Sequence, residues 1–560
     1  MTLEYADPAA TNAQPDHWRP DPPDAGPSSR PSAPPTGPGA APVAGRAALS
    51  LDGRWDFRFC GDGPFALGAG GQAWRTCMVP GPWQAQFADL RERNGRALYR
   101  RTFDLPADWA GGPALFLRFG AVSYHARVRV NGRAAVEHEG GYLPFEADVG
   151  ALVRPGRNEV SVEVTTPTDD PDLYPEFPLS EVPFGKQSWY GPLGGIWQSV
   201  TLERRSADHV RSVQVLPRLA DGTVEVSVAL ARPLARDHEL ELAVEGPGGG
   251  ATVACRVVAA AAGAQLVTTT ITVADPLPWS PDHPRLYRLA TTLRDADGAS
   301  LDAVAETFGF RTVEARDGRI HLNGEPIYLR GALDQDYYPD GICTPPSEAF
   351  LEDQFRKAKA LGLNCVRCHI KVPDPRYYAV ADRVGLLVWA ELPNVGRLTE
   401  RAAERLEATF QGVFERDGNH PSIFCWTIVN ENWGTDLLND EGHRAWLGRT
   451  YRWLKGLDPT RLVVDNSPCP PNFHVETDLN DWHFYAAIPD HRQAWDRFVE
   501  GYAAAPAWTH STAGDAERTG AEPLVCSEFG NWACPTPPCS RVPTAPSPGG
   551  SRPGTTGPRG

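Results

Sequence analysis

Two glutamates stand where apolar, strand-like runs of this sequence end. Glu431 closes the run IFCWTIVNE, and Glu528 closes the run PLVCSE. A carboxylate at the end of a buried strand is costly to desolvate unless it is paired or used, so a functional role is favoured. The alternative is a structural ion pair with a buried arginine. If the two side chains face one another, they have the chemistry that cleaves glycosidic bonds, because one carboxyl protonates the leaving oxygen while the other attacks or activates water.

The elements that must position these glutamates follow Phe310, where short strand-like runs begin to alternate with helical stretches. This alternation predicts parallel βα units. One helix is predicted over SEAFLEDQFRKAKALG, with Ser347 as its N-cap and Gly362 as its terminator. Seven strands indicate a nearly complete (β/α)8 TIM barrel, whose active site lies at the carboxyl ends of its strands. The expected strands are Ile327 to Gly331, Asn364 to His369, Leu386 to Glu391, Ile423 to Glu431, Leu462 to Asn466, Leu479 to Tyr485 and Pro523 to Glu528.

Glu431 and Glu528 then end the fourth and seventh strands, which lie roughly opposite one another in such a barrel. Cleavage with retention of configuration needs the two carboxyl groups about 5 to 5.5 Å apart. The spacing of the residues in the sequence does not measure that separation, so the stereochemical outcome does not follow from it.

The part of the chain before the barrel alternates short β-type runs with turns. Residues 46–205 contain ALFLRFGAV, ARVRVNGRAAV and NEVSVEVTT, and Asn131-Gly132 between two alternating strands predicts a hairpin. This pattern indicates an antiparallel β-sandwich. Residues 206–312 contain further period-two runs within about 100 residues, the size of an immunoglobulin-like β-sandwich. The predicted fold class is therefore multidomain, with two β-sandwiches followed by an α/β barrel over 313–533.

Both ends of the chain are expected to lack regular structure. Residues 1–45 are rich in Pro, Ala and Gly and predict a disordered tail. Residues 534–560 contain no Asp or Glu, many Pro and Gly, and no periodicity. They cannot supply an eighth strand and helix, so the barrel is expected to be truncated after its seventh strand. The change of composition near Cys534 suggests a shifted reading frame or a truncated gene.

Composition excludes several classes of partner. The formal net charge is -16 and the isoelectric point is near 5.4. Because no Lys/Arg stripe is present, we expect no nucleic-acid or anionic-membrane partner. No apolar run approaches the length of a membrane span, and the N-terminus lacks a secretory signal, so we expect a cytoplasmic protein. Cys365 and Cys368 form a CxxC without a second ligand pair at zinc spacing, so no metal is expected.

Seven strings, in order, make the chain resemble the β-galactosidases, β-glucuronidases and β-mannosidases of glycoside hydrolase family 2. The resemblance covers about residues 46 to 532. It implies a jelly-roll sugar-binding domain, an immunoglobulin-like domain and a (β/α)8 catalytic barrel. The strings are YRRTFDLP, RFGAVSYHARVRVNGR, GGYLPFEADVGALVRPGRNEVSVEV, GPLGGIWQSVTL, FGFRTVEARDGRIHLNGEPIYLRG, RDGNHPSIFCWTIVNEN and SEFG.

The resemblance assigns roles to the residues that match the family's motifs. Glu431 of Asn430-Glu431 looks like the acid/base, and Glu528 of SEFG looks like the nucleophile, which implies double displacement with retention and no cofactor. Asn430 would bind the sugar 2-hydroxyl, a hydrogen bond that strengthens as the oxocarbenium-like transition state forms. Arg367 is a suitable counter-charge for Glu528. The nucleophile must be ionised while the acid is protonated, so their environments must push the two pKa values apart.

Other candidate substrate contacts have competing structural roles. His369 lies in an Arg-Cys-His string that is one residue shorter than the family's Arg-x-x-His, so sugar contact and packing are equally favoured. Where many relatives carry Asn-Arg-His-Glu, this chain has LDQD, so Asp334, Gln335 and Asp336 stand as replacements. Aromatic rings offer an apolar platform to a pyranose, and the alternative for each of these residues is a role in the core. The candidates of this kind, with the neighbouring histidine, are Trp433, Trp482, His483 and Tyr485.

The predicted function is a retaining exo-β-glycosidase that acts on β-galactoside-like or related substrates. The Asn-x-Lys pair with which family glucuronidases hold the sugar carboxylate is absent, which makes a glucuronidase less favoured. The competing hypothesis is a degenerate or non-catalytic carbohydrate-binding protein, because an incomplete barrel would hold Glu528 poorly. Family members often form homo-oligomers, so a homo-oligomer is a further expectation.

Overall fold

A computed structural model describes residues 46–63, 65, 73–109, 114–186, 190–486 and 491–530. The tails predicted over 1–45 and 534–560 lie outside the described residues.

The first β-sandwich is built from two main antiparallel sheets, and valines at alternate positions fill the space between them. On one strand Val160, Val162 and Val164 are fully buried. A four-stranded sheet runs β1 (Ala47–Ser50), β12 (Val200–Arg205), β5 (Ala114–Phe119), β9 (Phe145–Asp148). A six-stranded sheet runs β3 (Arg75–Val79), β2 (Gly53–Gly61), β4 (Gly95–Leu105), β10 (Gly156–Thr166), β7 (His125–Val130), β8 (Arg133–Glu139).

The hairpin predicted at Asn131-Gly132 is confirmed. It joins β7 to β8, with φ of 51° at Asn131 and 79° at Gly132. Both central residues therefore adopt the left-handed conformation that a two-residue type I′ turn requires. A short helix α1 (Trp83–Gln86) and the two-stranded pair β6 (Val122–Ser123) and β11 (Gly195–Ile196) complete this sandwich.

The second β-sandwich has its own apolar core, centred on residues such as Val226, Leu242 and Leu289. Its three-stranded sheet runs β13 (Val210–Pro217), β14 (Thr223–Leu230), β17 (Leu266–Thr272). Its four-stranded sheet runs β16 (Thr252–Ala260), β15 (His238–Glu245), β18 (Tyr287–Arg294), β19 (Ser300–Phe308). Three short strands follow: β20 (Val313–Arg316), β21 (Arg319–Leu322), β22 (Glu325–Pro326).

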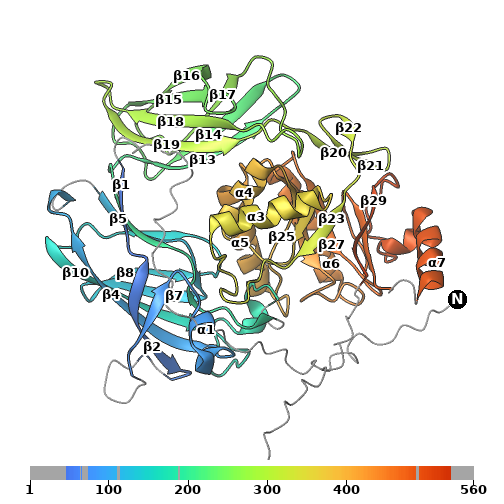
Figure 1. Ribbon diagram of the computed structural model, residues 1–560, viewed down its shortest axis with the longest axis horizontal. Helices are drawn as coiled ribbons and strands as arrows, with labels where there is room; N and C mark the ends of the chain where they lie inside the picture. Colours follow the sequence, from blue (N-terminus) through green and yellow to red (C-terminus); the bar gives the residue numbers. More distant parts are fainter. Residues whose placement is uncertain are drawn as a thin grey trace, which may run out of the picture. The chain divides into compact units, whose positions relative to one another are not determined.

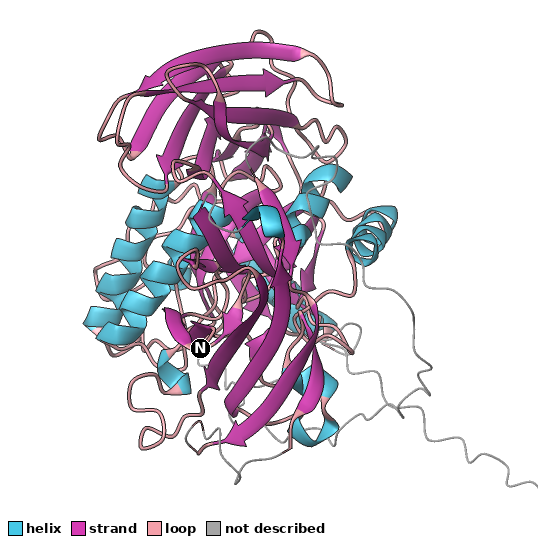
Figure 2. Cartoon of the chain, turned by 90° about the vertical axis from the view of Figure 1, so that its left-hand side faces the viewer, coloured by secondary structure: helices cyan, strands magenta, loops and turns pink. Residues whose placement is uncertain are grey.

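The part after β22 alternates parallel strands with helices, and in Figure 1 the helices α3 to α6 flank the strands. Figure 2 shows the change from strands alone to strands mixed with helices. Five strands pair in sequence order: β23 (Gly331–Asp334), β24 (Cys365–Cys368), β25 (Leu387–Glu391), β26 (Ile423–Asn430), β27 (Leu462–Ser467). A separate parallel pair is β28 (Asn480–Phe484), β29 (Leu524–Phe529). The helices are α3 (Glu348–Ala360), α4 (Arg376–Val384), α5 (Glu400–Asp417), α6 (Glu441–Leu457), α7 (Arg492–Ala503).

Six of the seven predicted strands are confirmed to within about two residues, and the first is wrong by four. It was expected over Ile327–Gly331, but β23 covers Gly331–Asp334. Pairing starts late because the ladder register places Gly331 opposite Cys365, and the side chain of Tyr328 is 81% exposed. Apolar content marks the segment but not the residue at which hydrogen bonding begins.

Within the described residues the parallel strands do not close into a barrel. β27 shares no ladder with β28, and β29 shares none with β23. The truncation predicted after the seventh strand concerns residues beyond 530, which lie outside the described part.

The predicted caps of α3 are confirmed. The side chain of Ser347 accepts a hydrogen bond from the backbone N–H of Phe350, which satisfies one of the free donors of the first turn. Gly362 follows the helix with φ of 87°, a conformation that glycine adopts without strain.

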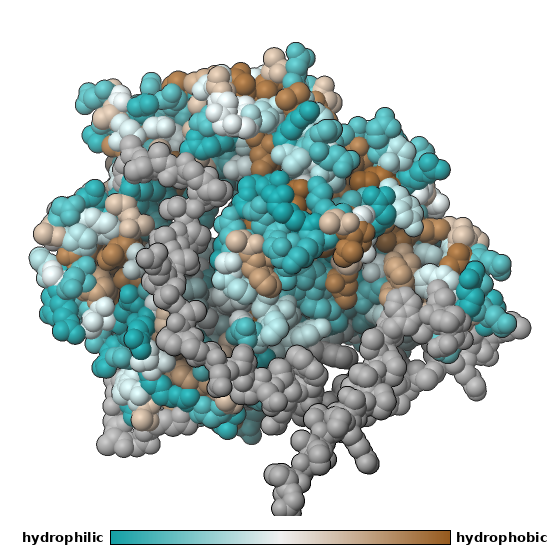
Figure 3. All heavy atoms as spheres, viewed as in Figure 1, coloured by the Kyte–Doolittle hydropathy of each residue, from teal (hydrophilic) through white to brown (hydrophobic). Residues whose placement is uncertain are grey.

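The surface in Figure 3 is mostly hydrophilic, with apolar side chains in small groups. No helix among the described residues has the length and apolar character that crossing a bilayer requires.

Candidate active site

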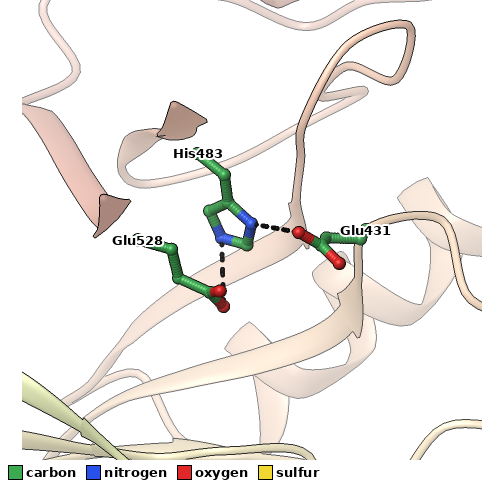
Figure 4. Close-up of side chains that lie close together, drawn as sticks. All are labelled: Glu431, His483 and Glu528. Atoms are coloured by element: carbon green, nitrogen blue, oxygen red, sulfur yellow. Dashed lines mark hydrogen bonds and ion pairs between the residues drawn. The ribbon is translucent and has the colours of Figure 1, made fainter. Parts of the chain in front are cut away.

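The carboxyl ends of β26, β28 and β29 bring three side chains together. Glu431 follows β26, while His483 lies on β28 and Glu528 on β29 (Figure 4). His483 lies between the two carboxylates, with Nδ1 2.8 Å from Oε1 of Glu431 and Nε2 3.5 Å from Oε1 of Glu528. One atom of each of the three groups lies within 4.8 Å of the others. The two glutamates singled out from the sequence therefore face each other.

A turn in the left-handed region aims Glu431 into the site. φ is 49° at Glu431 and 66° at Asn432, a conformation uncommon for residues other than glycine. The neighbouring strand β27 holds this turn, since the carbonyl of Ser467 accepts from the Glu431 N–H at 2.9 Å and the side chain of Asn466 accepts from the Asn432 N–H at 3.2 Å. Such backbone costs of order 1–3 kcal/mol per residue, so it persists where the surroundings fix it.

Arg367 joins the strand ends electrostatically. Its guanidinium donates to Oε1 of Glu528 at 2.7 Å and to Oδ1 of Asn430 at 2.9 Å. It also forms a close ion pair with Glu391 at the end of β25. The side chain of Arg367 is only 4% exposed. A planar fork can hold several acceptors at fixed angles, so Arg367 orients Glu528 and Asn430 relative to one another.

Positive groups counter the charge of Glu528, and they set its pKa. Burial alone would raise that pKa, but the charges of Arg367, His483 and His369 and the hydrogen bond from Tyr485 outweigh burial and lower it far below its ordinary value. The pKa of Glu431 is also lowered. Burial raises it, whereas the hydrogen bond and charge of His483 lower it more. The surroundings of Glu528 therefore favour its ionised form.

Tyr485 links the two carboxylates. Its hydroxyl lies 3.2 Å from Oε1 of Glu431 and makes a shorter hydrogen bond to Oε2 of Glu528. The spacing of the cluster in Figure 4 would also suit a cation. However, Arg367 and Tyr485 already donate to the carboxylates and His483 contacts both of them, so the arrangement is that of a hydrogen-bonded carboxylate pair.

Two buried polar atoms beside the pair have no hydrogen-bond partner in the described part of the chain. They are Nδ2 of Asn430 and Nε2 of His369, both on fully buried residues. The other ring nitrogen of His369 lies 3.0 Å from Glu391. Leaving a buried donor unpaired costs about 1–3 kcal/mol, so such atoms at a site are available to a ligand's hydroxyl groups.

Three further predicted substrate contacts have partners other than the carboxylate pair. Trp482 is 2% exposed and packs edge-on against Trp508 with ring centroids 4.7 Å apart. Because side chains alternate along β28, His483 points inward and Trp482 points away, so the geometry favours its core role. Asp336 is buried in an ion pair with Lys371, and Trp433 lies beside Phe184, at 6.3 Å between ring centroids.

A segment of the first sandwich reaches the strand ends. The N–H of Phe184 donates to the carbonyl of Asn394 at 2.8 Å, and the side chain of Asn394 accepts from the N–H of Asn430. At Gly185 a Cβ atom would lie 2.9 Å from Cβ of Lys371, so only glycine allows this approach.

Models of one family match nearly the whole described part of the chain. The sugar binding domain of glycosyl hydrolases family 2 matches residues 49–205, the second family 2 model matches 208–311, and the family 2 TIM barrel domain matches 313–537. The chain belongs to glycoside hydrolase family 2. The resemblance inferred from the seven strings is thereby confirmed.

Relatives within family 2 differ in the sugar that their names state. The chain is 28% identical over 436 residues to a β-galactosidase of Enterobacter cloacae, an alignment that covers 70% of this chain and 40% of that protein. The chain thus spans less than half the length of this relative. Its fold is similar to a β-glucuronidase from Ruminococcus gnavus bound to D-glucuronic acid (TM-score 0.69, 22% identity, 87% of this chain and 84% of that one). It is also similar to a family 2 β-galacturonidase from Eisenbergiella tayi bound to galacturonate (TM-score 0.68, 21% identity, 88% and 83%).

Sequence reasoning missed four polar residues at this family 2 site. Glu391 closes β25 as Glu431 closes β26, so the rule applied to the two glutamates would have found it. Ser467 likewise closes β27. Asn394 and Asp481 carry no comparable signal, because the first lies in a loop and the second lies inside a strand.

Proposed function

We propose that this chain is a retaining exo-β-glycosidase with Glu431 as acid/base and Glu528 as nucleophile. The observation that carries the proposal is the pair of carboxylates on two strand ends, close enough for one imidazole to contact both (Figure 4). Inverting enzymes hold their carboxyl groups about 6.5–9.5 Å apart to admit a water, whereas retaining enzymes hold them about 5–5.5 Å apart. Oxygen atoms within 4.8 Å of each other favour the retaining arrangement.

In the first step Glu528 attacks the anomeric carbon while protonated Glu431 gives its proton to the leaving oxygen. The C–O bond to the aglycone breaks and a glycosyl ester of Glu528 forms. In the second step ionised Glu431 takes a proton from water, the water oxygen attacks the anomeric carbon, and the ester bond breaks. Arg367 keeps Glu528 ionised before attack. The free Nδ2 of Asn430 is available to the sugar 2-hydroxyl.

The sugar is proposed as galactose-like or a related β-linked pyranose, and the relatives add uronic acids to the candidates. The three domains are proposed over 46–205, 206–312 and 313–533.

A second candidate function is carbohydrate binding without turnover. One observation favours it: β29 forms no ladder with β23 among the described residues. An open sheet edge constrains Glu528 less than a closed barrel would.

The test is hydrolysis of nitrophenyl β-galactoside, β-glucoside, β-mannoside, β-glucuronide and β-galacturonide by four proteins: wild type, Glu431→Gln, Glu528→Gln and the exposed helical control Glu404→Gln. We expect Glu528→Gln to lower kcat/KM on the order of 10⁴-fold or more, and Glu431→Gln to lower it roughly 10²–10⁴-fold, with the control unchanged. A folded wild type that is stabilised thermally by a sugar but turns over none of the five glycosides would replace the enzyme with the binding protein.

A further inference from the structure

A chain of hydrogen bonds leads away from Glu431 into the interior. His483 contacts Glu431 through Nδ1 at 2.8 Å, and its Nε2 lies 2.8 Å from Oγ of Ser467. The hydroxyl of Ser467 in turn makes a short hydrogen bond to Oδ2 of Asp481. Asp481 and His483 lie two residues apart on β28, so both point to the same face of the strand, toward Ser467 at the end of β27.

This chain is sealed from water at its inner end. Ser467 and Asp481 are fully buried, and His483 is 1% exposed. The second oxygen of Asp481, Oδ1, has no hydrogen-bond partner among the described residues, and no ion pair to Asp481 occurs there. A buried carboxylate with one hydroxyl partner is costly and does not serve packing, so its presence behind the site calls for a role.

Nε2 of His483 lies closer to Oγ of Ser467, at 2.8 Å, than to the donor Nη1 of Arg367, at 3.3 Å, which favours a proton on Nε2. A serine hydroxyl has one proton to give and a carboxylate oxygen can accept it, so Ser467 donates to Asp481. Oγ of Ser467 is then an acceptor for Arg367 at 3.0 Å and for Nε2–H of His483. In neutral His483 this leaves Nδ1 without a proton, and Nδ1 accepts the proton of Glu431.

We propose that Asp481, Ser467 and His483 form a proton relay that serves Glu431 as acid/base. The relay rests on the proposed function, because it assigns a partner to the proton that Glu431 transfers. His483 contacts the acid directly, whereas Ser467 and Asp481 are positioning residues that act through His483.

The relay has two states with the same number of protons. In the first state Glu431 carries its proton, which it donates to Nδ1 of His483, while Nε2–H donates to Ser467 and Ser467 donates to ionised Asp481. In the second state each proton has moved one place inward, so that Glu431 is ionised, Nδ1 is protonated, Nε2 accepts from Ser467, and Asp481 is protonated. The first state suits the acid that protonates the leaving oxygen. When Glu431 gives its proton to the leaving oxygen, the chain holds one proton fewer, and the proton that ionised Glu431 then takes from water restores the first state.

Charged groups of both signs lie around His483. Nη1 of Arg367 lies 3.3 Å from Nε2, and a second positive charge there would be repelled. Glu528 on β29 is 3.5 Å from Nε2 and opposes this effect, but its charge is shared with Arg367 and Tyr485. A cationic His483 would hold Glu431 ionised, which is the case in which its charge lowers the pKa of Glu431. A neutral His483 that accepts from the protonated carboxyl favours the acid form instead.

The deciding variant is Asp481→Asn. The new amide N–H₂ at position 481 would donate to Ser467, Ser467 would then donate to Nε2, and Nδ1–H would donate to Glu431 and keep it ionised. Loss of the acid matters most when the leaving group is poor. On the glycoside that wild type hydrolyses best, we expect kcat/KM to fall at least about 10-fold more for the methyl glycoside than for the 2,4-dinitrophenyl glycoside, with the basic limb of the pH profile moved to lower pH.

Matched variants separate the relay from a packing effect. Ser467→Ala should show the same dependence on leaving group, and Ser467→Thr, which keeps the hydroxyl, should restore the wild-type ratio between the two substrates. An equal loss on both substrates in Asp481→Asn would overturn the relay while leaving the glycosidase intact. If Glu431→Gln itself showed no dependence on leaving group, the proposed acid/base would fail instead.

A measurement on the unaltered protein covers the case in which Asp481→Asn or Ser467→Ala does not fold. In protein labelled with ¹⁵N-histidine, the ring signals of His483 are identified by their loss in His483→Gln. At pH values where the enzyme is active on the methyl glycoside, we expect a protonated Nε2 and an unprotonated Nδ1. A doubly protonated ring, or one protonated only at Nδ1, at those pH values would contradict the relay.

Discussion

The strand β26 carries a carboxylate–histidine pair near each of its ends, and the two pairs differ in what satisfies the carboxylate. Before the strand, His420 contacts Oδ2 of Asp382 at 2.5 Å, and Oδ1 of Asp382 accepts from the backbone N–H of Ser422. After the strand, Oε1 of Glu431 contacts the side chains of His483 and Tyr485.

The comparison shows that burial and ion pairing alone do not mark a reactive group. In the pair at the amino end, one carboxylate oxygen of Asp382 contacts His420 and the other accepts from the backbone N–H of Ser422. The indole N–H of Trp279 donates to the backbone carbonyl of Asp382, so the residue is held on both sides. The pair at the carboxyl end is held by side chains that can give up or receive protons. In parallel barrels the amino ends of strands serve stability and the carboxyl ends serve chemistry, and here one strand presents both uses.

Among the variants that compare the two strand ends, the largest expected effect is a loss of activity from Arg367→Lys at the carboxyl end. A lysine ammonium cannot reach Glu528, Asn430 and Glu391 together. The carboxylate of Glu528 and the amide of Asn430 would then no longer be held in fixed positions relative to one another. We expect kcat/KM to fall roughly 10²–10³-fold, the cost of removing one preorganised donor. Steady-state kinetics on the best nitrophenyl glycoside measures it.

The matched control is Arg461→Lys at the amino end. Arg461 is equally buried and donates to Asp458 and to the carbonyls of Ile423 and His420. The control should lower the melting temperature while leaving kcat/KM of the folded protein within about 3-fold of wild type, because surrounding barrel packing does not move the distant carboxylates. Equal catalytic losses in both variants would remove the distinction between the two strand ends.

The next effect is on stability, from Asp382→Asn. Removing the charge leaves His420, whose side chain is 18% exposed, without its ion pair. Breaking a buried pair on one side costs about 3–5 kcal/mol, and we expect a loss toward the lower end of that range. Urea unfolding followed by tryptophan fluorescence measures this loss. The ratio of kcat/KM between the methyl and 2,4-dinitrophenyl glycosides should stay at its wild-type value, unlike the ratio in Asp481→Asn.

Much of the fold follows from local sequence pattern. Period-two runs locate the sandwich strands, and apolar runs separated by helical stretches locate the parallel strands. Ser347 and Gly362 mark the ends of α3 because capping is a local interaction. The first parallel strand was displaced because its start depends on Cys365, a partner far along the chain. Whether the parallel strands pair into a closed barrel likewise depends on residues far apart in the chain.

The site divides in the same way. Glu431, Glu528 and Arg367 stand out in the sequence because they are polar residues in or at the end of apolar strand runs. The structure brings them together. Asp481 and Asn394 are not marked, because their value depends on which strand or loop lies beside them. The hydroxyl that connects Asp481 to His483 comes from β27, and no spacing within one segment encodes that contact.

The smallest expected effect is on the pH dependence of stability, and it has opposite sign at the two ends of the barrel. Burial would lower the pKa of His420, but the charge and hydrogen bond of Asp382 raise it above 6.5. A raised folded-state pKa contributes stability that is complete below pH 6.5 and is lost as the pH rises through the folded pKa. The pKa of Glu528 is lowered, so its contribution is present above pH 4.5 and is lost as the pH falls. The measurement is the midpoint of urea unfolding between about pH 4 and pH 8. We expect the midpoint of the wild type to decline above pH 6.5, and to decline less there in Asp382→Asn. We expect Glu528→Gln to flatten the dependence of the midpoint on pH only below pH 4.5. If either substitution flattened the opposite side of the curve, the assignment of separate roles to the two strand ends would be wrong.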